Sequence, residues 1–362
     1  MAVTDEQVKT ALSNIIDPHL DADIVTTNAL KAIDVDAAHV SINIELGYPA
    51  AGWKAALSQQ ITDAVVALDG VDKVSVDVSW KIDSHAVQKN LKPLDGIKNI
   101  IAVASGKGGV GKSTTAVNLA LALKEEGATV GILDADIYGP SQPRMLGVSG
   151  QPDSPDGKSL SPMIGHGIQS MSIGYLVDEE TPMIWRGPMV TQALQQLLGD
   201  TIWTDVDYLI IDLPPGTGDT QLTLAQQIPV SGAVIVTTPQ DIALIDAIKG
   251  LRMFEKVEVP VLGVVENMSM HICSECGHAE PIFGTGGGER MAADNDIELL
   301  GQLPLDINIR VDADRGNPTV AADPESTTSL IYRDIARKVT AKLSAKTKDY
   351  SAKFPTIQIL DN

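Results

Sequence analysis

The chain has little of several residue types, and each shortage narrows the class of protein. Only two of its 362 residues are cysteine, too few for the disulfide framework of a small secreted protein. Aromatic residues make up 4% of the sequence, and 47 acidic residues against 27 basic ones give a formal net charge of −20. Binding to nucleic acid or to an anionic membrane needs a basic patch or stacking rings, so the composition argues against both partners.

Long hydrophobic runs are also missing. No apolar stretch approaches the roughly 20 residues that a membrane-spanning helix needs. Residues 1–6 are mostly polar or acidic and are not followed by the apolar segment of a secretory signal. We therefore expect a cytoplasmic protein. Hydrophobic residues still make up 44% of the chain, enough for a packed core, and the length favours two domains.

Periodicity predicts a first domain at residues 1–82, followed by a linker at 83–94. The first domain contains two helical patterns and two strands of alternating polarity, which is typical of a small α+β domain. These patterns cover residues 4–16 and 50–68 for the helices, and 40–46 and 74–80 for the strands. The linker breaks the periodicity and contains Lys92-Pro93.

The second predicted domain, residues 95–362, alternates short apolar runs with helical segments. This pattern predicts an α/β fold, with a mostly parallel sheet that helices cover on both faces. The clearest later runs are 129–133, 208–211, 233–236 and 261–265. Ligands of such sheets bind at the carboxyl ends of the strands, so motifs that follow these runs are expected along one edge.

A phosphate-binding loop follows the apolar run at 99–104 and precedes a helical segment. In its Gly-x-x-x-x-Gly-Lys-Ser spacing, the glycines let backbone N–H groups converge on phosphate oxygens. Lys112 is placed to reach the terminal phosphates and the Ser113 hydroxyl to bind Mg²⁺, while the helix N-terminus favours the same anion. The predicted nucleotide-binding residues are Gly106, Lys107, Gly108, Gly109, Val110, Gly111, Lys112, Ser113 and Thr114.

A second lysine in this loop, Lys107, makes it resemble the deviant P-loop of the nitrogenase iron protein, MinD and ParA family. In that family the first lysine reaches across a dimer to the nucleotide of the partner chain. A cation from a second subunit neutralises charge on the transferred phosphoryl group, as an arginine finger does. The resemblance therefore implies a P-loop NTPase that binds ATP as a homodimer.

Carboxylates end two of the strands on the expected nucleotide edge. By the same resemblance, Asp134 and Asp136 belong to switch I, with Asp134 nearer Mg²⁺ and Asp136 positioning or activating the attacking water. A strand-end carboxylate that merely caps a helix N-terminus is the alternative. Asp212 begins the segment 212–219, which resembles Walker B and switch II, where a carboxylate holds Mg²⁺ through water. The implied catalytic residues are Lys107, Lys112, Asp136 and Asp212.

Asn267 ends the apolar run that begins at 261. The resembling proteins use an asparagine amide at this point to recognise adenine, and an amide offers both the donor and the acceptor that N6 and N7 of adenine require. An Asx turn that closes the strand is an equally good interpretation on sequence grounds.

Cys273 and Cys276 follow the same strand, and their Cys-x-x-Cys spacing lets two thiolates face one soft metal centre. A four-thiolate iron–sulfur cluster or a tetrahedral zinc site needs two more ligands, and the chain has no further cysteine. Two chains of a dimer would supply four thiolates. A zinc site that uses His271 or His278, a redox-active dithiol, and two ordinary surface thiols are the alternatives.

Taken together, the deviant P-loop, the segments 185–189 and 212–219 and the Cys-x-x-Cys pair resemble the Mrp/ApbC family of iron–sulfur cluster carrier ATPases. The likeness covers about residues 95–345. It implies a slow ATP hydrolase that binds a labile [4Fe-4S] cluster at the dimer interface and transfers it to apo-proteins, with cluster scaffold proteins as further partners. The other interpretation is a MinD/ParA-like ATPase that controls attachment to membrane or DNA, for which the basic helical segment at 327–346 is the candidate.

Residues 1–82 resemble an iron–sulfur-assembly-type small domain. Some stand-alone relatives of that domain carry a cysteine, and this segment has none. His19 follows Asp17-Pro18 where an acidic residue is common. The domain therefore offers no thiolate for a cluster, and we expect it to recognise partners.

Overall fold

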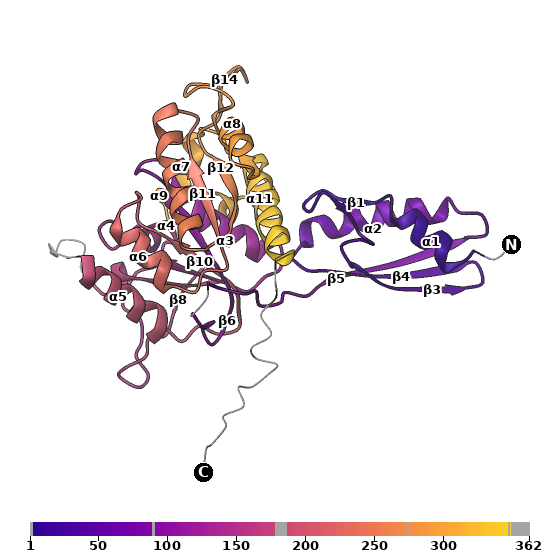
Figure 1. Ribbon diagram of the computed structural model, residues 1–362, viewed down its shortest axis with the longest axis horizontal. Helices are drawn as coiled ribbons and strands as arrows, with labels where there is room; N and C mark the ends of the chain where they lie inside the picture. Colours follow the sequence, from indigo (N-terminus) through magenta and orange to yellow (C-terminus); the bar gives the residue numbers. More distant parts are fainter. Residues whose placement is uncertain (1–2, 89–90, 178–186, 274, 347, 349–362) are drawn as a thin grey trace, which may run out of the picture.

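Two separate sheets organise the chain, seen here in a computed structural model that describes residues 3–88, 91–177, 187–273, 275–346 and 348. The smaller sheet lies at one end of the long axis and the larger one at the other (Figure 1). Trp185 and Arg186 of the segment 185–189, and the tail beyond residue 348, lie outside the described residues.

The N-terminal region, called here the small domain, packs two helices on a three-stranded sheet. Strands β3 and β4 are antiparallel, whereas β4 and β5 are parallel. Thr4 and Gln7 form a capping box that starts the first helix. The elements are α1 (Asp5–Leu12), β1 (Ile16–Asp17), β2 (Ala22–Asp23), β3 (Leu30–Asp36), β4 (His39–Leu46), α2 (Ala51–Val66) and β5 (Lys73–Trp80).

The larger sheet has the order β15-β12-β11-β6-β10-β7-β9-β8 among the described residues. Every neighbouring pair is parallel except β8 and β9. Its strands are β6 (Ile97–Ala104), β7 (Val130–Asp134), β8 (Met163–Gly165), β9 (Ile168–Ser172), β10 (Val206–Asp212), β11 (Gly232–Thr237), β12 (Val261–Glu266) and β15 (Leu299–Gln302). The predicted fold class, a mostly parallel sheet preceded by a small α+β domain, is confirmed.

Helices cover both faces of this sheet. Apolar residues of α3 (Lys112–Glu125) and α11 (Thr327–Ser344) form one core, and those of α5 (Gly187–Asp200), α6 (Asp219–Gln227) and the end of α7 (Asp241–Lys256) belong to the core of the other face. The remaining elements are α4 (Gln142–Met145), the 3₁₀ helix η1 (Ile173–Tyr175), β13 (His271–Ile272), β14 (Ala279–Glu280), α8 (Gly287–Asp294), α9 (Ile307–Asp314) and α10 (Thr319–Ala322).

The apolar face of α11 is part of the protein core, where Tyr332, Ile335 and Val339 are buried. Two of its lysines are held in ion pairs, Lys338 with Asp334 and Lys342 with Glu298. Within the described ranges, none of the helices combines the length and apolar character that crossing a bilayer requires.

Candidate functional site

The P-loop connects the central strand β6 to α3, at the carboxyl edge of the sheet. Gly111 caps α3 with a φ of +83°, in the left-handed region that favours glycine. A Cβ atom at this position would lie 2.1 Å from Nδ2 of Asn267. The loop therefore requires glycine here for both its backbone angle and its space, as its motif predicts.

Lys112 and Asp212 meet in this site. Strand β10 lies beside β6, so Asp212 ends next to the P-loop, and its carboxylate accepts a hydrogen bond from the Lys112 ammonium. Both side chains are buried, with exposed fractions of 6% and 0%. The same ammonium lies 3.1 Å from Oγ of Ser113. Lys112, Ser113 and Asp212, which are expected to contact phosphate and Mg²⁺, thus lie together. The charges of Lys112 and Asp212 balance each other.

Gln142 is a residue of this site that the sequence reasoning missed. Its side-chain amide donates to Oδ2 of Asp212 (2.9 Å) and to the carbonyl of Ser113 (3.1 Å). Its Oε1 is buried and has no hydrogen-bond partner within the described part of the chain. The sequence around Gln142 contains no motif that indicates this role, because its partners Ser113 and Asp212 lie far away in the sequence.

Asp134 holds the loop that follows β7. It is fully buried, and its carboxylate accepts hydrogen bonds from the backbone N–H groups of Asp136 (3.1 Å), Ser141 (2.9 Å) and Gln142 (3.0 Å) and from the Ser172 hydroxyl (3.2 Å). Burial and the nearby charge of Asp212 raise the pKa of Asp134 to about 7. Asp134 thus caps the short α4, as in the alternative noted from the sequence, and its role beside Mg²⁺ stays a prediction.

Asp136 is half-buried beside the site. Its pKa is raised, first by burial and also by the charge of Asp212, while the charge of Lys112 opposes the shift. The charges of Lys112 and Asp212 therefore both act on the Asp136 carboxylate. A carboxylate with a raised pKa is suited to accepting a proton.

The segment after β10 contacts the P-loop directly. The backbone N–H of Gly216 donates to the carbonyl of Ser105 at 2.9 Å, and Gly216 has a φ of +106°. Gln221 of α6 donates to the carbonyl of Pro215 at 2.6 Å. A movement of the P-loop would therefore be transmitted to the start of α6 through the short loop that contains Pro215 and Gly216.

Lys107 of the P-loop is half-buried. Its carbonyl accepts a hydrogen bond from the Ser105 hydroxyl at 2.9 Å. Within the described residues its ammonium forms no ion pair, in contrast to Lys112. The preceding Gly106 packs against the backbone of α7, where a Cβ atom would lie 2.1 Å from the carbonyl carbon of Asp246.

The side chain of Asn267 forms hydrogen bonds with the loops around it. Its Nδ2 donates to the carbonyl of Val110 at 2.9 Å, and its Oδ1 accepts from the backbone N–H of Met268 at 2.9 Å. The side chain is buried. Both halves of the amide are therefore engaged in fixing the P-loop against the end of β12, and recognition of adenine by Asn267 stays a prediction.

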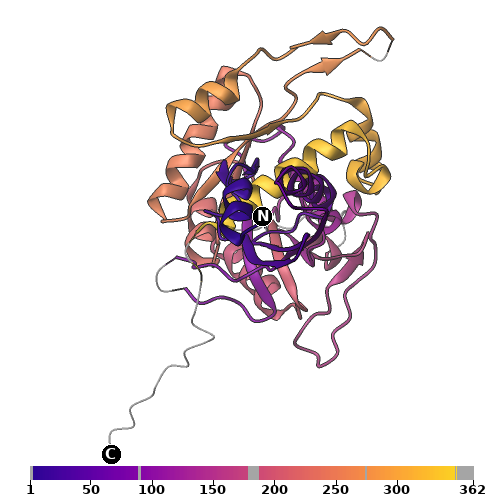
Figure 2. The same cartoon turned by 90° about the vertical axis from the view of Figure 1, so that its right-hand side faces the viewer.

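Cys273 and Cys276 lie at the tip of a hairpin formed by β13 and β14, which projects beyond α8 at the top of Figure 2. The hairpin is closed by a backbone hydrogen bond from Cys273 to His278 (2.9 Å) and one from Gly277 to Cys273 (2.8 Å). Cys273 is half-buried and Cys276 exposed. Both thiols are thus accessible from outside the chain.

The hairpin tip favours a thiolate at Cys273. The pKa of this thiol is lowered by hydrogen bonds from the backbone N–H groups of Cys276 and Glu275 and from the Cys276 thiol. Thiolate is the form of cysteine that binds metals. The hairpin tip therefore favours the form of Cys273 that binds a metal.

A zinc site within one chain is not assembled in the described residues. No group of three or more His, Cys, Asp or Glu side chains among them is placed to hold a metal ion. His271 instead lies with Nδ1 3.1 Å from the carbonyl oxygen of Leu305, and His278 is exposed.

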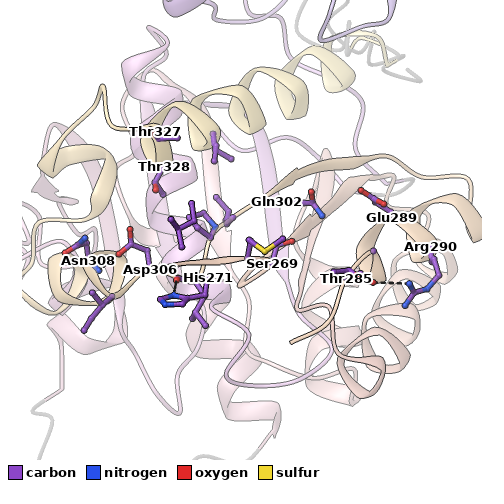
Figure 3. Close-up of a pocket in the computed structure, with 18 residues that line it drawn as sticks. Ser269, His271, Thr285, Glu289, Arg290, Gln302, Asp306, Asn308, Thr327 and Thr328 are labelled. Carbon is purple, nitrogen blue, oxygen red and sulfur yellow. Dashed lines mark hydrogen bonds between the residues drawn. The ribbon is translucent and has the colours of Figure 1, made fainter. Parts of the chain in front are cut away.

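A pocket of about 870 Å³ lies beside the base of the hairpin (Figure 3). Its walls come from the segments after β12 and β15 and from the starts of α8, α9 and α11. The buried carboxylate of Glu266 connects these walls, because it accepts hydrogen bonds from Ser269 (2.6 Å), Gln302 (2.8 Å) and the backbone of Gly288. The volume lies in the usual range of ligand pockets.

Comparison with known proteins gives matches to both parts of the chain. The family described as NUBPL iron-transfer P-loop NTPase matches residues 96–340, and the family described as iron–sulfur cluster assembly protein matches residues 5–78. An iron–sulfur cluster carrier protein of Salmonella typhimurium is 55% identical over 92% of this chain and 90% of its own length. The mouse iron–sulfur cluster transfer protein NUBPL is 50% identical over 70% of this chain and 80% of its own.

Among solved structures, a nucleotide-binding protein from Archaeoglobus fulgidus in complex with ADP is 38% identical. The match covers 64% of this chain and 90% of that one, with a TM-score of 0.57. Together with the P-loop and the cysteine hairpin, these matches establish that the chain belongs to the family of NUBPL-type iron-transfer P-loop NTPases.

Proposed function

We propose that the protein is a homodimeric ATP-dependent carrier that binds a labile [4Fe-4S] cluster between the Cys273 and Cys276 thiolates of two chains and transfers it to apo-proteins. The observation that carries this proposal is the hairpin, which presents exactly one pair of accessible thiols from a P-loop NTPase domain. A four-thiolate cluster on such hairpins requires two chains.

The nucleotide site fits ATP and Mg²⁺. The P-loop presents the N-terminus of α3, and the Lys112 ammonium contacts both the Ser113 hydroxyl and the Asp212 carboxylate. The unpartnered Oε1 of Gln142 is a further buried acceptor at this point. When bound, Mg²⁺ would neutralise charge on the phosphates. Lys112 would hold the phosphates of its own chain, and Asp136 would position the attacking water.

A nucleotide site that needs a residue from a second chain would account for slow hydrolysis. Lys107 is half-buried and forms no ion pair with described residues, which leaves its ammonium available, and we propose that in a dimer it completes the site of the partner chain. The contact of Gly216 with Ser105 links loss of the γ-phosphate to the loop that starts α6. ATP turnover would thereby change the dimer geometry and with it access to the cluster.

Two observations favour this proposal over a MinD/ParA-like role in membrane or DNA attachment. The apolar face of α11 is buried against α3, so it offers no surface to a bilayer. Lys338 and Lys342 are already paired with carboxylates. We propose that the small domain recognises the recipient apo-proteins and cluster scaffold proteins.

Mixed dimers test the bridging geometry. Reconstituted wild-type protein is expected to hold about four irons per dimer, and Cys273→Ala or Cys276→Ala to hold none. A heterodimer of wild type with the double cysteine variant has two thiols in all, so it should also lose its cluster. If such heterodimers keep half of the wild-type iron, the cluster is ligated within one chain and the bridging proposal is wrong.

A further inference from the structure

Glu126 is a fully buried carboxylate at the boundary between the two domains, where it caps the carboxyl end of the P-loop helix α3. Its Oε1 accepts hydrogen bonds from Arg333 (2.7 Å) and Arg337 (2.8 Å) of α11. Its Oε2 accepts from the backbone N–H of Gly52 (2.8 Å), and its carbonyl accepts from that of Ala51 (3.1 Å). One residue therefore joins α3, α11 and the small domain.

Helix α2 of the small domain depends on this contact. Its N-cap residue, Ala50, has no side chain that can accept a hydrogen bond, and its first turn contains no acidic residue. The backbone N–H groups at a helix start need partners, and a negative charge there is favourable. Glu126, in the other domain, supplies both a hydrogen-bond acceptor and a negative charge to this helix start.

Gly52 leaves room for the ends of the Glu126 and Arg333 side chains at this junction. A Cβ atom on Gly52 would lie 2.6 Å from a guanidinium nitrogen of Arg333 and 2.7 Å from Oε1 of Glu126. A second close approach occurs at Gly127, where a Cβ atom would lie 2.5 Å from the indole ring of Trp80. Trp80 itself packs against the cores of both domains. The small domain is thus docked by an ion-pair cluster and by apolar contact.

Helix α3 connects this junction to the nucleotide site. Lys112 is its first residue and Glu126 follows its last, which at 1.5 Å per residue places the two ends roughly 20 Å apart. Residues 115–123 between them are all buried. A helix packed on all sides moves as one body, so a shift at its phosphate-binding end reaches the carboxylate that holds α2.

We propose that nucleotide binding and docking of the small domain are coupled through α3, with Glu126 as the positioning residue. Docking holds α3 where its N-terminus binds the nucleotide, and nucleotide in turn tightens docking by the same factor, because coupling between two binding equilibria is reciprocal. This inference rests on the nucleotide-binding part of the proposed function and does not depend on cluster carriage.

Titration of the full-length protein with Mg²⁺ and ADP tests one direction of the coupling. Gly52→Ala places a methyl group in the junction without touching the P-loop, and Gly199→Ala is the matched control, since a Cβ atom there has open space. We expect Gly52→Ala to weaken ADP binding by at least about fivefold relative to the control. Glu126→Gln keeps an acceptor for Gly52 but loses its charge, so we expect an intermediate loss.

Hydrogen exchange at the Ala51 and Gly52 amides tests the other direction. In the wild type, ADP should slow exchange at both amides, and in Gly52→Ala it should not. The inference is overturned if ADP leaves these amides unchanged in the wild type, a measurement that needs no variant to fold. It is also overturned if Gly52→Ala exchanges fast but binds ADP as the control does. A wild-type protein that binds no nucleotide would instead refute the proposed function.

Discussion

The ammonium of Lys112 and the carboxylate of Asp212 form a buried ion pair. Lys112→Ala should abolish tight ATP binding, because no other group of the same loop is proposed to supply a charge to the phosphates that its own chain binds. It should also lower the free energy of unfolding by roughly 3–5 kcal/mol, since Asp212 is left as an unpaired buried charge. Calorimetric titration and denaturant unfolding measure the two effects.

A double variant separates these effects. Asp212→Asn removes the unpaired charge, so Lys112→Ala combined with Asp212→Asn should recover much of the stability and none of the ATP affinity. If the double variant is as unstable as Lys112→Ala alone, the ion pair is not the cause of the loss.

Lys107→Ala should behave differently from Lys112→Ala. Since Lys107 has no ion pair with described residues and is proposed to act on the partner's nucleotide, binding should largely survive while hydrolysis falls. Nucleotide titration and single-turnover phosphate release give the two quantities. Equal losses of binding and hydrolysis would contradict the action across the dimer.

Two P-loop glycines with the same φ of +83° provide a matched pair. Gly109→Ala should cost about 1–2 kcal/mol of stability, the cost of placing a side chain in the left-handed region. Gly111→Ala should cost more, because its methyl group would displace Asn267 from the Val110 carbonyl, whereas a Cβ atom on Gly109 has open space. Urea unfolding without nucleotide measures both. Equal costs would show that the Asn267 contact is unimportant.

The pH dependence of alkylation tests the hairpin tip. Because backbone N–H groups and the Cys276 thiol lower the pKa of Cys273, iodoacetamide should modify Cys273 at a lower pH than it modifies an ordinary thiol. Cys276→Ala keeps the backbone donors and loses the thiol donor, so the midpoint should rise only part of the way. Urea-unfolded protein is the control, and a midpoint equal to that control would contradict the hydrogen-bonded tip.

His19 predicts a pH dependence of stability. Burial alone would lower the pKa of this imidazole, but hydrogen bonds to Asp17 and Asp334 outweigh it, so the pKa lies above the ordinary 6.5 despite the opposing charge of Arg337. The protonated ring then contributes stability that is fully present below pH 6.5 and is lost as the pH rises through the higher value of the folded state.

His19→Gln removes the titrating group. The melting temperature of the wild type should therefore fall more than that of the variant as the pH rises above 6.5. Parallel melting curves for the two proteins across this range would show that His19 makes no net contribution.

Patterns of short range predict much of the fold. The alternating residues of β4 and β5 and the apolar runs of β6, β10 and β12 identify these strands within a residue or two, because each is decided by local periodicity. Strand β3 has a weaker pattern, since its register shifts between Leu30 and Ala32, and it was not predicted. The three-residue β8, antiparallel at the sheet edge, is too short for a periodic pattern and was also not predicted.

Roles that depend on distant partners could not be predicted. Asp134 ends strand β7, and only the fold shows that backbone N–H groups occupy its carboxylate. Glu126 reads as an ordinary exposed residue at a helix end, yet its partners lie 74 residues before it and more than 200 residues after it. Spacing reveals a motif within one loop, whereas such charge clusters arise only from tertiary structure.

Helix α11 has a consequence for how the nascent chain folds. The ribosome makes it after every strand of both sheets, yet its residues complete the core on the α3 face, and Ala341 also belongs to the core of the small domain. Until α11 emerges, the side of α3 that packs against it has no cover. A chain that stalls before residue 327 would therefore expose a hydrophobic surface beside an already formed P-loop, the kind of surface that chaperones bind.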